Sequence, residues 1–99
     1  MRVFYGGIYV ERNTLQEAAI EHPIKLEYYK IINKENETYG IDIVKTEYKK
    51  NNIIIEEKKI KHLSQDESKI EKLLKIFKSF AVTPVTAQDV VDDLLKQSF

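Results

Sequence analysis

The sequence changes character at Ser64-Gln65-Asp66-Glu67, a segment with the spacing of a helix capping box. In such a box the Ser side chain caps the first backbone N–H groups of a helix, and the Glu three positions later bonds back to the Ser backbone. Residues 24–63 before it are rich in Ile, Tyr and Lys and have strand character, whereas the residues after it have helical character. The segment therefore predicts a β-rich part followed by a helical part.

The length and composition predict one soluble globular domain. The chain has 99 residues, of which 42% are hydrophobic and 32% charged. A chain of this length can bury one compact core, and this composition is ordinary for a folded protein. We expect a single domain over residues 1–99, made of an N-terminal segment (1–23), a β-meander (24–63) and a helical part (64–97).

The β-rich part predicts a three-stranded antiparallel meander, with strands at about 24–33, 39–48 and 53–62. We expect cross-strand charge pairs to set its register, because opposite charges on facing residues stabilise a strand pair. For the first hairpin this places Lys25 opposite Glu47, Glu27 opposite Lys45 and Lys30 opposite Asp42. For the second hairpin it places Lys45 opposite Glu56, Asp42 opposite Lys59 and Tyr48 opposite Ile53.

In this register each face of the sheet carries its own apolar group. One face has Tyr29, Ile31, Tyr39, Ile41, Ile43 and Ile60, and the other has Ile24, Leu26, Tyr28, Val44, Tyr48, Ile53 and Ile55.

The helical part predicts two helices by its apolar periodicity. The first runs from Asp66 to about Phe80, and the second runs from Ala87 to about Lys96 behind a Thr86 cap. The N-terminal segment leaves alternatives open. Gly6-Gly7 could form a tight hairpin turn, and Thr14-Leu15-Gln16-Glu17 could open a short helix through Glu21.

Three runs of residues resemble a family of small clostridial proteins known only as a domain of unknown function. These runs are Leu26-Glu27-Tyr28-Tyr29, then residues 39–45, then Val82-Thr83-Pro84-Val85 before the acidic helix at 89–95. The resemblance covers residues 24–97 and implies a Gram-positive source. It carries no catalytic or binding residue to transfer.

Motifs for catalysis or metal binding are missing from the sequence. There is no Cys, and His22 and His62 lie far apart without metal-ligand spacing. No nucleophile elbow, phosphate loop or His-Glu-x-x-His pattern occurs. Asp89, Asp92 and Asp93 are typical of the solvated face of a helix. We expect a non-enzymatic protein with no catalytic residue, no cofactor and no metal.

Charge and hydropathy argue against nucleic acid and membrane as partners. The net charge is zero, and no apolar run is long enough to span a bilayer. A weak nucleic-acid-binding module remains the alternative, since Lys49, Lys50, Lys58, Lys59 and Lys61 could form a basic sheet surface. The acidic start of the first helix, Asp66-Glu67, opposes phosphate binding there.

The favoured function is protein interaction. Two short helices can cover only one face of the sheet, and the first helix begins beside Ile31, Ile41 and Ile60, so the opposite face needs another cover. We expect a small cytoplasmic interaction or regulatory protein that binds a protein partner, or itself as a homodimer, through that face. The candidate partner-binding residues are Leu26, Tyr28, Val44, Tyr48, Ile53 and Ile55.

Overall fold

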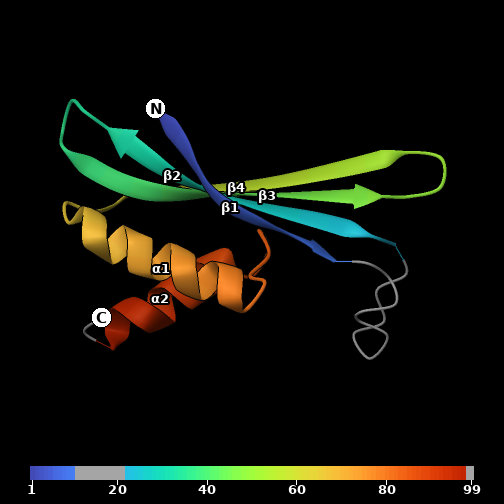
Figure 1. The fold of residues 1–99 in the computed structure, drawn as a ribbon. Coiled ribbons are helices and arrows are strands. Elements are labelled where there is room, and N and C mark those ends of the chain that lie inside the picture. Colours follow the sequence, from blue (N-terminus) through green and yellow to red (C-terminus); the bar gives the residue numbers. More distant parts are fainter. Residues whose placement is uncertain (11–21, 98–99) are drawn as a thin grey trace.

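The computed structural model, which describes residues 1–10 and 22–97, is a four-stranded antiparallel sheet with two helices on one of its faces (Figure 1). The strands are β1 (Arg2–Val10), β2 (Ile24–Asn33), β3 (Thr38–Tyr48) and β4 (Ile53–Ser64), followed by α1 (Glu67–Ser79) and α2 (Ala87–Lys96). The strands lie in the sheet in chain order. The predicted α+β class, the meander and both helices are confirmed, but the prediction of three strands is wrong because β1 adds a fourth.

β1 is one continuous strand, so the predicted hairpin turn at Gly6-Gly7 is wrong. Both glycines pair with β2, and Tyr5 is an extra residue in a bulge between Phe4 and Gly6. The physical reason is length. Two arms of three residues would form a marginal hairpin, whereas a nine-residue strand gains a full ladder against β2. The possible helix from Thr14 to Glu21 lies outside the described residues.

The β2–β3 register is shifted by one residue from the charge-based prediction, which is therefore wrong. Lys25 lies opposite Thr46 rather than Glu47, and Asp42 lies opposite Tyr29 rather than Lys30. A one-residue shift moves every side chain of a strand to the other face. Here it brings all the buried apolar residues of β2 and β3 to one face, and their burial outweighs charge pairs of about 0.2–1 kcal/mol each.

The β3–β4 register agrees with the prediction through most of its length. Lys45 lies opposite Glu56, and Asp42 lies opposite Lys59. Beyond Ile41 the register shifts around Gly40, and β4 carries extra residues there. A Cβ on Gly40 would overlap the carbonyl oxygen of Ile60, so only glycine allows the two backbones to lie this close.

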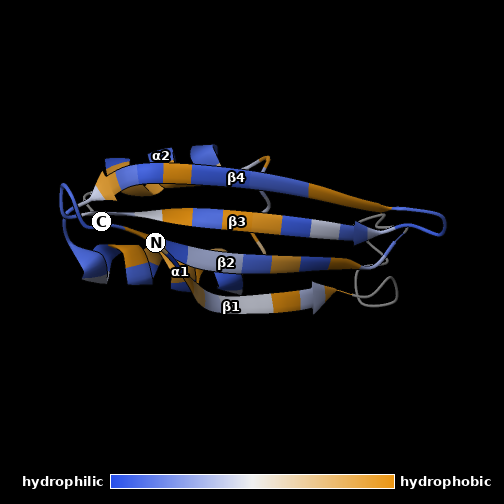
Figure 2. Ribbon diagram, turned by 90° about the horizontal axis from the view of Figure 1, so that it is seen from above, coloured by the Kyte–Doolittle hydropathy of each residue, from blue (hydrophilic) through white to orange (hydrophobic). Residues whose placement is uncertain are grey.

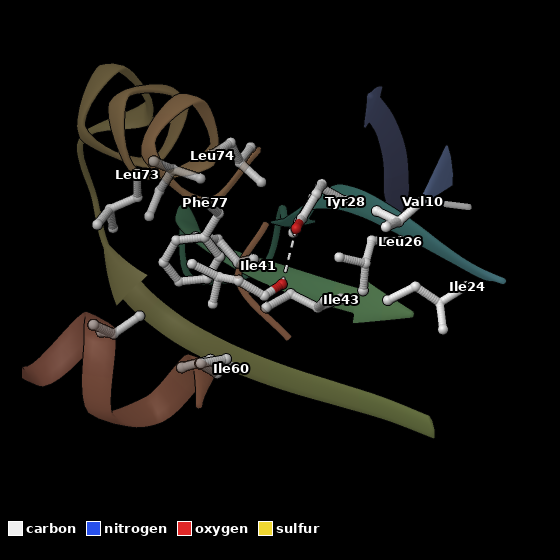
Figure 3. Close-up of a cluster of buried hydrophobic side chains, with 14 residues drawn as sticks. Val10, Ile24, Leu26, Tyr28, Ile41, Ile43, Ile60, Leu73, Leu74 and Phe77 are labelled. Atoms are coloured by element: carbon white, nitrogen blue, oxygen red, sulfur yellow. Dashed lines mark hydrogen bonds between the residues drawn. The ribbon is translucent and has the colours of Figure 1, made fainter. Parts of the chain in front are cut away.

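The core lies between the sheet and the helices (Figure 3). The sheet contributes Leu26, Tyr28, Ile41, Ile43 and Ile60, and the helices contribute Ile70, Leu73, Leu74, Phe77, Ala87 and Val91. The Tyr28 hydroxyl donates to the carbonyl oxygen of Val82 at 2.8 Å, which ties β2 to the segment between the two helices. Burial of that hydroxyl raises the pKa of Tyr28.

The helix bounds are close to those predicted, but the cap of α1 is not Ser64. Asp66 is the N-cap, and its side chain accepts a hydrogen bond from the Ser68 backbone N–H at 3.0 Å. Ser64 instead ends β4, and its hydroxyl accepts from the Asp66 N–H at 2.9 Å. The box therefore marks the strand-to-helix turn, and the helix begins two positions later than its spacing indicates.

Candidate functional site

The helices leave the second face of the sheet without a layer over it in the described parts of the chain (Figure 1). We call this second face the open face, and Figure 2 shows it from above. The observed registers assign to it Arg2, Phe4, Gly7, Tyr9, Lys25, Glu27, Tyr29, Ile31, Asp42, Val44, Thr46, Tyr48, Ile53, Ile55, Glu57 and Lys59. The sequence predicts an uncovered sheet face of this kind.

The structure divides the predicted partner-binding residues between the two faces. Leu26 and Tyr28 are fully buried in the core under the helices, so that part of the predicted surface is wrong. The other four lie on the open face: Val44 and Tyr48 half-buried, Ile53 and Ile55 exposed. The division follows directly from the shifted β2–β3 register.

Tyr9 joins these four residues, and sequence reasoning missed it. Its ring lies 6.2 Å from that of Tyr48, measured between centroids. We call Tyr9, Val44, Tyr48, Ile53 and Ile55 the open-face patch. The signal for Tyr9 was available in the alternation along β1, but it disappears when Gly6-Gly7 is interpreted as a turn.

The sheet extends past the helices at its β3–β4 turn (Figure 1), and Tyr48 and Ile53 are the strand residues that flank this turn. α1 has 13 residues and so spans about 20 Å, whereas β4 has 12 residues and spans roughly 40 Å. Ile53 and Ile55 are 60% and 65% exposed. Two large apolar side chains, two positions apart on the same face of β4, are thus exposed to solvent.

An ionic cluster occupies the middle of the open face. One guanidinium nitrogen of Arg2 lies 2.9 Å from a carboxylate oxygen of Asp42 and 3.4 Å from one of Glu57. The same guanidinium group stacks 3.9 Å above the Tyr29 ring. Arg2 therefore links β1 to β3 and β4 across the face of β2.

The two carboxyl groups of this cluster interact with one another. Asp42 is fully buried, and its Oδ1 has no hydrogen-bond partner among the groups that carry hydrogens at neutral pH. A hydrogen bond with Asp42, together with burial, raises the pKa of Glu57. A protonated Glu57 can donate to Asp42, and this hydrogen bond favours the protonated form of Glu57.

A hollow of about 600 Å³ lies beside the cluster, towards the β2–β3 turn. Its lining includes Arg2, Asp42, Lys59, Lys61 and His62. His62 has a left-handed backbone with φ of 57°, and its Nδ1 lies 2.8 Å from the Thr38 hydroxyl oxygen. Asn36 of the β2–β3 turn, at 3.3 Å from the same nitrogen, and Thr38 at the start of β3 thus hold the His62 ring.

The predicted basic surface is interrupted. Lys58 and Lys59 are consecutive on a strand and so lie on opposite faces, and Glu56 and Glu57 alternate with them. Within residues 1–10 and 22–97, no group of three His, Asp or Glu side chains is placed to hold a metal ion. No helix in the same ranges is long and apolar enough to cross a membrane.

The fold and the open face define a class of small α+β proteins in which helices cover one side of an antiparallel sheet. Within this class the chain belongs to the Family of unknown function (DUF6514), whose model matches residues 7–97. The resemblance to a domain of unknown function is therefore confirmed, and the clostridial source stays a prediction. No curated protein and no solved structure matches the chain.

Proposed function

We propose that the protein is a non-enzymatic interaction module that binds another protein through the open-face patch. The observation that carries the proposal is the exposure of Ile53 and Ile55 on the strand beside Tyr48, whose ring lies against that of Tyr9. Exposed apolar side chains grouped on one face are typical of protein-binding sites, whereas single exposed ones are ordinary.

The surroundings of the patch support a protein as the ligand. Lys25, Glu27 and Glu57 lie on the same face around the apolar side chains, which gives an apolar centre with a charged margin of both signs. Protein interfaces have this arrangement, and Tyr is enriched in them. A surface for nucleic acid would instead need a continuous basic stripe, and the Glu residues of β4 interrupt it.

The proposal includes a regulatory role in the cytoplasm of a Gram-positive bacterium. The Cys-free sequence is consistent with a reducing compartment. The family resemblance supports the Gram-positive source.

The test compares two substitutions that add the same charge to exposed apolar positions. Ile55→Lys alters the patch, and Val85→Lys alters the connection between the helices, where Val85 is 77% exposed. A photo-crosslinking residue at position 53 identifies the bound protein in cells, and titration with the purified partner measures affinity. We expect Ile55→Lys to weaken binding by about tenfold or more, and Val85→Lys to leave binding unchanged, with both variants as stable as the wild type. Equal affinity of the two variants would contradict the proposal.

A further inference from the structure

The two edges of the sheet differ in charge. β4, at one edge, carries Glu56, Glu57, Lys58, Lys59 and Lys61. β1, at the other edge, has no charged residue from Val3 to Val10. Charged side chains on an edge strand discourage pairing with another chain, and an uncharged apolar edge favours it. The charges of β4 therefore discourage strand pairing at its edge of the sheet, whereas the edge at β1 can pair with another strand.

β1 also presents apolar side chains at that edge. Val3, Phe4, Tyr5 and Tyr9 are 40%, 57%, 39% and 56% exposed. In the described structure the outer side of β1 has no neighbouring strand. Its outward backbone groups can bond to an added strand while these side chains pack against that strand, which is how sheets bind extended partners.

We propose that β1 pairs antiparallel with β1 of a second copy of this chain, which joins two four-stranded sheets into one across a two-fold axis. The bulge at Tyr5 selects the register. It places Arg2 and Phe4 on the open face before the bulge, and Gly7 and Tyr9 on the same face after it. Facing residues in a strand pair must lie on the same face.

One pairing satisfies this condition over the whole strand. It sets Arg2 of each copy opposite Tyr9 of the other, Val3 opposite Ile8, and Phe4 opposite Gly7. Apolar side chains then meet on the helix side, and the Phe4 ring can cover the backbone of a facing glycine. Tyr5 faces Gly6 across the axis, beside the Lys78 side chain that lies over Gly6. β1 is thus complementary to itself, which is why a second copy is the occupant.

On the helix side of the axis, one lysine from each copy opposes dimerisation by charge repulsion. Lys78 of α1 reaches Gly6, and its Nζ would lie 3.3 Å from a Cβ built at that position. In the dimer the two Lys78 ammonium groups approach each other across the axis. Because salt screens this repulsion, we expect dimer affinity to rise with ionic strength, opposite to the behaviour of a complex held by ion pairs.

Two measurements test the dimer. Light scattering over a concentration series should show a mass approaching twice the 11.6 kDa of the chain. Tyr5→Lys, which adds a charge at the axis, should weaken dimerisation by about tenfold or more. The same change at the opposite edge of the sheet, Ile55→Lys, should leave dimerisation unchanged.

Disulfide trapping tests the register without depending on a destabilising change, because the chain has no Cys of its own. A mixture of Val3→Cys and Ile8→Cys chains should form a linked dimer under mild oxidation. Either variant alone should link far more slowly, because identical positions lie five residues apart across the pair, roughly 17 Å.

This inference is independent of the proposed function, and its failure is distinguishable from failure of that function. A monomer at all concentrations overturns it. So does a dimer that Ile55→Lys disrupts and Tyr5→Lys does not, since that result assigns dimerisation to the open-face patch. Binding of β1 only to a strand from a different protein overturns it as well.

Discussion

The contact between Asp42 and Glu57 makes the stability of this protein depend on pH. Asp42 is fully buried although it lies on the open face, because Arg2 and Tyr29 pack over it. A second carboxyl group beside a buried carboxylate favours a shared proton. The raised pKa of Glu57 reflects this arrangement, with the hydrogen bond to Asp42 as its main cause.

We predict that Glu57→Gln removes a pH dependence of folding. Because the folded pKa of Glu57 is raised above the unfolded value, its contribution to stability is fully present below the unfolded pKa and is lost as pH rises through the folded pKa. A Gln amide donates to Asp42 at any pH. The free energy of unfolding of Glu57→Gln should therefore fall less than that of the wild type as pH rises through this window.

Urea unfolding at a series of pH values measures the difference between the two proteins. Glu56→Gln is the matched control, because Glu56 is the preceding residue and pairs with Lys45 on the other face at 4.0 Å. If the free energy of unfolding changes with pH in the same way for wild type and Glu57→Gln, the proposed hydrogen bond from protonated Glu57 to Asp42 is contradicted.

At the scale of elements, the structure separates what periodicity can predict from what it cannot. α1 and α2 follow from apolar stripes in the sequence, and their bounds agree with prediction to within a residue or two. β1 was missed because Gly6-Gly7 has the composition of a turn. Only pairing with β2, a contact between distant residues, makes it a strand.

The β2–β3 register could not be obtained from charges for a related reason. Each charge pair is weak, and the competing term is the burial of Leu26 and Tyr28 in a core that includes helices far along the chain. That error assigned Leu26 and Tyr28 to the candidate site. The β3–β4 register was correct because there the charge pattern and the burial pattern agree.

We predict that Gly40→Ala destabilises the end of the β3–β4 pair. The added methyl group overlaps the Ile60 backbone, which cannot move without breaking the register shift. The loss should be about 3 kcal/mol, the upper part of the range for overpacked sites. Gly6→Ala is the control, because its methyl group meets only the flexible Lys78 side chain, and thermal unfolding should show a much smaller change.

At the scale of the whole molecule, the helices and the sheet form two layers joined by the buried core and by the ion pairs of Lys30 with Glu67 and Glu71. Among the described residues, the hydrogen bond from the Tyr28 hydroxyl to the Val82 carbonyl joins the sheet to the connection between the helices. Tyr28 also packs edge-to-face against Phe77 of α1, with 6.5 Å between ring centroids. A single side chain of β2 therefore holds both the helix and the segment that follows it.

We predict that Tyr28→Phe lowers the free energy of unfolding by about 1–3 kcal/mol, since it leaves the buried Val82 carbonyl without a donor. The ring contact with Phe77 is kept. Tyr29→Phe is the neighbouring control, because the Tyr29 hydroxyl donates to Glu27 in a partly exposed position. Denaturant unfolding compares the two, and equal losses would show that the Val82 bond contributes no more than a surface bond.

The order of the elements along the chain has a consequence for synthesis on the ribosome. All four strands precede both helices, and each strand pairs with its neighbour in sequence, so sheet formation needs little long-range search. Of the described elements, only α1 and α2 cover the apolar face of that sheet, and they emerge last. A nascent chain that has reached Ser64 thus exposes Leu26, Ile41 and Ile43 to solvent, and such exposed apolar surface makes a chain prone to aggregate.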